Sequence, residues 1–110
     1  MATDRPEPRI TLHPHSRRVR VIIDGTVLAD TTRAIELRER GYPPRQYLPR
    51  DDVRMDLLTR SDSVTHCPFK GDASYFSFCE HQDVAWSYQQ PLEGMEALAG
   101  RLVFYKGVSE

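Results

Sequence analysis

Cysteine and tryptophan are scarce in this chain of 110 residues, which holds two of the first and one of the second. Two cysteines cannot build the disulfide framework of a small secreted domain, so a packed core must stabilise the fold. No apolar run approaches the roughly 20 residues of a membrane span, and the N-terminus lacks the apolar segment of a signal peptide. We therefore expect a cytoplasmic protein with no membrane partner.

Strong net charge is also absent. The formal net charge is -1, and no run of five or more like charges occurs. This balance gives no reason to expect a nucleic-acid partner. Residues 1–60 carry 12 arginines against 9 acidic residues, whereas residues 61–110 carry 3 basic against 7 acidic residues. The asymmetry either marks complementary faces or means nothing, which leaves a homo-oligomer open.

The length and composition suit one domain. Hydrophobic residues make up 39% of the chain and charged residues 28%, an ordinary balance for a globular protein. Eight prolines and six glycines indicate many turns and short elements. We expect residues 1–9, which are polar and proline-rich, to form a flexible tail, and residues 10–110 to form a single β-rich domain.

The clearest local signal is a β-hairpin. Residues 19–23 are rich in β-branched side chains, Asp24-Gly25 is a strong hairpin turn, and residues 26–30 form the return strand. Residues 34–40 alternate apolar and charged side chains and favour a strand, although they are also good helix formers. Weaker patterns predict strands at 10–12, 65–67, 73–79, 84–88 and 102–105. Helical turns are predicted at 51–58, capped by Asp51 or Asp52, and at 92–99. Loops are predicted at 61–63 and 68–72.

These elements amount to six or seven strands and at most two short helices. The fold class is therefore all-β, with two small antiparallel sheets. Alternation along residues 84–88 places Trp86 inside the fold. Cys79 is expected to be a core thiol.

The segment from Thr65 to Tyr75 combines a thiol, an ammonium group and a glycine turn. If Lys70 folds back towards Cys67, its charge would favour the thiolate, and Cys67 would be a nucleophile or a redox-sensitive thiol. The alternative is a buried Cys67 packed as a small hydrophobe, with Lys70 in a salt bridge. His66 is a poor base for Cys67, because neighbours on a strand face opposite sides.

A ligand pocket is a second interpretation of the same region. Charged groups would converge between aromatic walls, as in many small-molecule sites. The charged groups are Glu39, Asp52 and Lys70, and the walls are Tyr47, Tyr75, Trp86 and Tyr88. The alternative is that the aromatics are core and the charges form a structural ion-pair network.

A metal site is a third interpretation, because four residues carry suitable sulfur and nitrogen donors. Cys79 and His81 lie two apart, the spacing that shares one strand face, and Cys67 and His66 could complete the set.

Several motifs together resemble a known family. They are Val19-Arg20-Val21 with Asp24-Gly25 and Ala29-Asp30-Thr31; Glu39 with residues 43–53; residues 67–75; Ala85-Trp86-Ser87-Tyr88 with Pro91; and Gly100 with Val103-Phe104-Tyr105. Over roughly residues 10–108 the chain is similar to the bacterial domain-of-unknown-function family 427. The resemblance implies a Mss4-like, or β-tent, fold in which two antiparallel sheets share a core.

The resemblance also bears on metals and on one suggested activity. Relatives of that architecture often hold zinc on Cys-x-x-Cys knuckles, which this chain lacks, and the family pattern includes only Cys67 of the four donors. We therefore expect no metal and no cofactor. A nucleotidyltransferase-like label sometimes given to the family would need carboxylates on one face, whereas the neighbours Asp51 and Asp52 would point apart.

The leading hypothesis is a small-molecule-binding module with its pocket around the Cys-Pro-Phe-Lys-Gly motif. The first alternative is an enzyme that uses Cys67 as a nucleophile activated by Lys70. The second is a protein-interaction domain that binds through an exposed sheet edge. Nothing in the sequence chooses a ligand or substrate.

Overall fold

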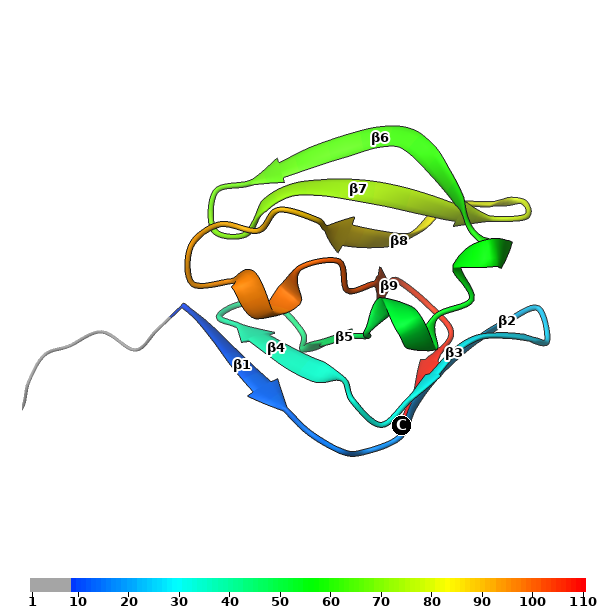
Figure 1. Ribbon diagram of the computed structural model, residues 1–110, viewed down its shortest axis with the longest axis horizontal. Helices are drawn as coiled ribbons and strands as arrows, with labels where there is room; N and C mark the ends of the chain where they lie inside the picture. Colours follow the sequence, from blue (N-terminus) through cyan, green and yellow to red (C-terminus); the bar gives the residue numbers. More distant parts are fainter. Residues whose placement is uncertain (1–8) are drawn as a thin grey trace, which may run out of the picture.

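The computed structural model describes residues 9–110, whose regular structure consists mainly of short antiparallel strands (Figure 1). Three sheets form, with strand orders β1-β4-β5, β10-β2-β3 and β6-β7-β8-β9. The strands are β1 (Ile10–Pro14), β2 (Val19–Ile23), β3 (Thr26–Thr31), β4 (Ile35–Glu39), β5 (Arg45–Tyr47), β6 (Thr59–Cys67), β7 (Gly71–Phe78), β8 (His81–Tyr88), β9 (Val103–Phe104) and β10 (Val108–Ser109). The predicted all-β class is confirmed, although the strands are more numerous than expected. Apart from Arg9, the tail predicted at residues 1–9 lies outside the described residues.

The expectation of two sheets is wrong, because one long ribbon divides into two. β1 continues into β2 and β3 into β4, and the two arms stay antiparallel neighbours, with the His15 amide donating to the Ala34 carbonyl at 3.2 Å. The ribbon bends between these halves, and each half then acquires its own third strand: β5 pairs with β4, and β10 pairs with β2. In Figure 1 the ribbon runs along the lower edge of the molecule, below the four-stranded sheet.

The predicted hairpin at residues 19–30 is confirmed. Asp24 and Gly25 both have positive φ, 52° and 78°, as the tight turn that suits the strand twist requires. Val19, Val21 and Ile23 are buried on one face of β2, as β-branched side chains in alternation should be. The strand predicted at residues 34–40 also forms, as β4.

The loop predicted at residues 61–63 is wrong, because β6 runs through it. The polar residues there lie on an edge strand whose side chains mostly face water, so polarity does not indicate a loop. Ser61 and Ser63 donate their hydroxyls to the two carboxylate oxygens of Asp83, each at 2.6 Å. A shift of register between Arg60 and Val64 accommodates this stretch against β7.

Helical structure in the described chain is limited to three single turns: η1 (Arg50–Asp52), η2 (Met55–Leu57) and η3 (Glu96–Leu98). The longer turns predicted at 51–58 and 92–99 shrink because such short segments give too few backbone hydrogen bonds to offset helix initiation. The predicted cap by Asp51 or Asp52 is also wrong, since no side chain caps these turns. No helix of the described residues is long and apolar enough to cross a membrane.

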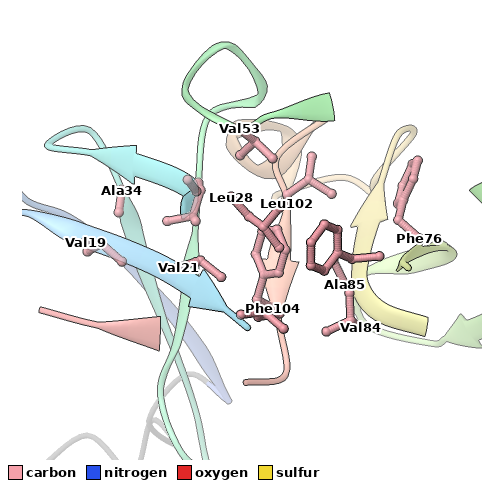
Figure 2. Close-up of a cluster of buried hydrophobic side chains, with 14 residues drawn as sticks. Val19, Val21, Leu28, Ala34, Val53, Phe76, Val84, Ala85, Leu102 and Phe104 are labelled. Carbon is pink, nitrogen blue, oxygen red and sulfur yellow. The ribbon is translucent and has the colours of Figure 1, made fainter. Parts of the chain in front are cut away.

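Two hydrophobic clusters join the sheets. The first lies between the β2–β3 hairpin and the strands β7, β8 and β9, and Figure 2 shows Val21 and Leu28 opposite Ala85 and Phe104. The second lies between the β1-β4-β5 sheet and the same four-stranded sheet. Its buried members are Ile35, Leu37, Tyr47, Ala73, Trp86, Tyr88, Leu98 and Val103.

The segment from residue 102 to residue 109 touches all three sheets. Leu102 exchanges backbone hydrogen bonds with Leu48, which directly follows β5. β9 then pairs with β8, and β10 pairs with β2. Residues 102–109 therefore connect three sheets that share no strand.

Candidate functional site

A cavity of about 290 Å³ opens beside the second hydrophobic cluster. It is lined by residues that come from β4, the turn after it, the start of β5, the end of β6, the β6–β7 turn, β7, β8 and the residue that follows β9. The lining residues are Leu37, Glu39, Tyr42, Pro43, Arg45, Cys67, Lys70, Tyr75, Trp86, Tyr88 and Tyr105. Six residues that the sequence marked as site candidates thus meet around one space: Glu39, Cys67, Lys70, Tyr75, Trp86 and Tyr88.

An ion pair forms part of the cavity wall. Two backbone hydrogen bonds fix the turn that carries Lys70. The Lys70 amide donates to the Cys67 carbonyl at 3.3 Å, and the Lys70 carbonyl accepts from the Leu92 amide at 3.0 Å. The Nζ atom of Lys70 lies 3.1 Å from Oε1 of Glu39, and the two side chains are only 12% and 10% exposed. Arg9 approaches the other carboxylate oxygen, with Nε 3.6 Å from Oε2. The pair is therefore nearly withdrawn from solvent, although it borders an open space.

Aromatic rings form most of the remaining wall. Trp86 and Tyr105 lie with their ring centroids 4.2 Å apart, tilted by 40°. Tyr88 stacks on Tyr47 at 6.5 Å, and the Lys70 ammonium lies 5.7 Å from the Tyr88 ring centre. Burial raises the pKa of Tyr88, and burial with the neighbouring Tyr75 raises the pKa of Tyr105 to about 12. These phenols are thus neutral hydrogen-bonding groups at physiological pH.

Arg45 is the second cation on the wall. It begins β5, opposite Leu37 of β4. Its guanidinium carbon lies 5.5 Å from the ring centre of Trp86 and 5.8 Å from that of Tyr105, so two aromatic faces hold it. Within the described chain its side chain makes neither an ion pair nor a hydrogen bond.

Cys67 lines the cavity and is half-buried. The ammonium group of Lys70, which was the expected activator of its thiol, contacts Glu39 instead. His66 turns away, as strand alternation predicts, and its Nδ1 lies 2.7 Å from a carboxylate oxygen of Asp72 on the exposed face. The neighbouring His66 is therefore not placed as a base for the Cys67 thiol.

The other suggested metal donors lie elsewhere. Cys79 is exposed, so its assignment as a core thiol is wrong: it sits in the β7–β8 turn with a φ of 51°, past the end of the strand. His81 lies between Asp24 and Lys106, with each ring nitrogen 2.7 Å from one of them. Among residues 9–110, no three histidine, cysteine or acidic side chains are grouped closely enough to hold a metal ion.

Two predicted pocket residues do not line the cavity. Asp52 belongs to η1, where its carboxylate accepts a 2.6 Å hydrogen bond from the Thr31 hydroxyl and pairs with Arg33 at 3.2 Å. Tyr47 lies behind Tyr88 with no solvent exposure. Its hydroxyl has no hydrogen-bond partner among the described residues. Burial, then the neighbouring Tyr88, raises its pKa.

Sequence reasoning missed five lining residues: Leu37, Tyr42, Pro43, Arg45 and Tyr105. The stretch from residue 43 and Tyr105 were assigned to family motifs, but neither was predicted to line a pocket. The available signal was Tyr42 and Arg45, which flank a Pro-Pro pair shortly after Glu39.

Comparison with known families completes the description. Residues 11–110 match the model of a domain of unknown function, DUF427. No curated protein matches the chain. The Mss4-like, or β-tent, architecture implied by the resemblance stays a prediction. Because the match spans nearly the whole chain, the chain belongs to the DUF427 family.

Proposed function

We propose that this DUF427 protein is a binding module for a small molecule, held in the cavity between β4 and β8. The supporting observation is that segments far apart in sequence place aromatic walls, a buried ion pair and a stacked arginine around one space. Apolar walls with a few placed polar groups are typical of ligand sites. Since 290 Å³ is at the small end of ligand pockets, the occupant has one or two rings.

The rim of the cavity supports the same proposal. Tyr42 and Tyr105 both line it, yet they are 62% and 50% exposed. Large aromatic surfaces left in water are costly unless something covers them in function. A ligand that enters between these rings would bury them.

Binding is better supported than nucleophilic catalysis. The proposed activation of Cys67 required the charge of Lys70, and that charge is neutralised by Glu39. A reactive thiol also needs a base, and the neighbouring His66 faces Asp72 on the other side of the strand. Cys67 is then a residue of the cavity wall, and a group attached to its sulfur would occupy part of the cavity.

The test uses that sulfur to block the cavity. In a Cys79→Ser background, methyl methanethiolsulfonate would modify only Cys67, and a Cys67→Ser/Cys79→Ser protein given the same treatment is the unmodified control. A set of one- and two-ring compounds, acidic, neutral and basic, is titrated while the indole N–H signal of Trp86 is followed by NMR. This signal is unique, because the chain has one tryptophan, which lies on the wall.

We expect several compounds to shift the Trp86 signal saturably, and blocking of Cys67 to abolish the shifts while the control protein keeps them. Native mass spectrometry of freshly purified protein would add the identity of any retained ligand. The proposal fails if no compound shifts the signal of the folded protein, or if the blocked protein binds as well as the control.

A further inference from the structure

The charges on the cavity wall do not cancel. Lys70 and Glu39 neutralise each other at 3.1 Å, and Glu39 also has Arg9 at 3.6 Å. The remaining charged group among the lining residues is Arg45. The wall therefore presents one positive charge without a counter-ion in the described chain.

The contacts of Arg45 differ from those of other arginines in the protein. Carboxylates pair with many of them, at 2.6 to 3.2 Å for Arg17, Arg18, Arg33, Arg38 and Arg54. Arg45 is held instead by the faces of Trp86 and Tyr105, which use the π surface of its guanidinium and leave its N–H donors unused. A guanidinium oriented by stacking keeps its planar row of donors for a carboxylate, which it can bind through two parallel hydrogen bonds.

We propose that the ligand is a planar aromatic molecule of one or two rings that carries one carboxylate, bound by Arg45. This inference rests on the proposed function of the cavity. The single unpaired charge matches a monoanion, whereas a doubly charged phosphate would leave negative charge close to Glu39. The exposed rings of Tyr42 and Tyr105 supply apolar surface for the aromatic part.

The experiment compares three probes: 2-naphthoate, its neutral amide 2-naphthamide, and cyclohexanecarboxylate, which has the charge without the planar ring. Binding is measured by titration of the Trp86 indole signal in the wild type, in Arg45→Gln and in Arg45→Lys. Arg60→Gln is the matched control, because it removes the same charge on β6, outside the lining of this cavity.

We expect the wild type to bind naphthoate at least about tenfold more tightly than naphthamide, since hydrogen bonds to charged groups contribute at the upper end of the usual range. Arg45→Gln should remove this preference, Arg45→Lys should restore part of it, and Arg60→Gln should keep it. Cyclohexanecarboxylate should bind more weakly than naphthoate. Added salt should reduce the preference.

The two proposals fail in different ways. If naphthamide binds the wild type as tightly as naphthoate, or if Arg45→Gln keeps the preference for the acid, the carboxylate inference is overturned and the binding module stands. Tight binding of cyclohexanecarboxylate would overturn the planar part. If neither these three probes nor any compound of the one- and two-ring set shifts the Trp86 signal, both the binding module and the carboxylate inference are refuted.

Discussion

The buried ion pair between Glu39 and Lys70 permits a quantitative test of how the cavity is built. We consider Lys70→Met, Glu39→Gln and the double variant. At 3.1 Å and an effective dielectric constant of about 20, the two charges attract each other by about 5 kcal/mol before desolvation is counted. Removing one partner of a buried pair commonly costs about 3–5 kcal/mol, because the other charge is left without compensation.

The structure modifies this figure for each variant. In Lys70→Met, Arg9 still lies 3.6 Å from the Glu39 carboxylate, so we expect a loss of about 2–3 kcal/mol. In Glu39→Gln, the Tyr88 ring is the partner that Lys70 keeps among the described residues, so we expect a loss of about 3–4 kcal/mol. The double variant leaves no buried charge unpaired, since Arg9, which loses its carboxylate, is 46% exposed, and it should lie within about 1 kcal/mol of the wild type. The pair should thus show strong coupling in a double-mutant cycle.

The free energy of unfolding is obtained from urea denaturation, followed by the fluorescence of Trp86. The surface pair Arg54–Asp56, whose side chains are 58% and 63% exposed, is the control and should show no measurable coupling. If each single variant costs less than about 1 kcal/mol and the two effects add, water in the cavity screens the charges, and our description of a withdrawn pair is refuted.

Three further predictions concern the backbone, acid stability and thiols. Gly107→Ala should destabilise the fold by about 2–4 kcal/mol, because the new Cβ would lie 2.5 Å from a backbone oxygen at a φ of 82°, whereas Gly25→Ala, at a similar φ in open space, should cost about 1 kcal/mol in urea denaturation. Hydrogen bonds, first from the Arg38 guanidinium, lower the pKa of Glu36 to about 2, so the stability that this carboxylate gives above about pH 4.5 should be lost between pH 4.5 and 2. Glu36→Gln should flatten that part of the curve of unfolding free energy against pH, and equal acid sensitivity of both proteins would contradict this. Cys79 should react with Ellman's reagent well before Cys67, as judged by mass spectrometry of the partly labelled protein, and the opposite order would show that the exposures are misassigned.

Local signals account for the parts of the fold that sequence could predict. The Asp24-Gly25 turn carries its own conformational preference, and the strands β4 and β8 form where apolar and polar residues alternate in the sequence. Trp86 is buried as expected, but its neighbours Ala85 and Ser87 are buried too, so both faces of β8 are covered there. The parts that escaped prediction depend on distant partners: β6 is a strand because β7 lies beside it, although its own residues are those of a loop.

The cavity residues divide in the same way into those that the sequence could indicate and those that depend on distant partners. Glu39 and Lys70 could be proposed together because both belong to family motifs, but nothing local indicates that Asp52 would turn to Thr31 instead. Arg45 and Tyr105 come close only through the packing of β5 against the end of β9, which no short-range pattern encodes. Register and packing between sheets are properties of the whole chain, so the missing residues were those supplied by long-range contacts.

The position of the segment that includes β9 and β10 has a consequence for how the chain acquires its structure during synthesis. The hairpins β2–β3, β6–β7 and β7–β8 can form as soon as their own residues have been made, because each joins neighbours in sequence. The pairings of Leu102 with Leu48 and of Val108 with Val21 close loops of more than 50 residues and await residues 102–109. Until those residues are available, the hairpins leave strand edges and apolar faces uncovered. Completion of the fold, and with it of the cavity wall at Tyr105, therefore follows the synthesis of residues 102–109 and comes after the three hairpins can form.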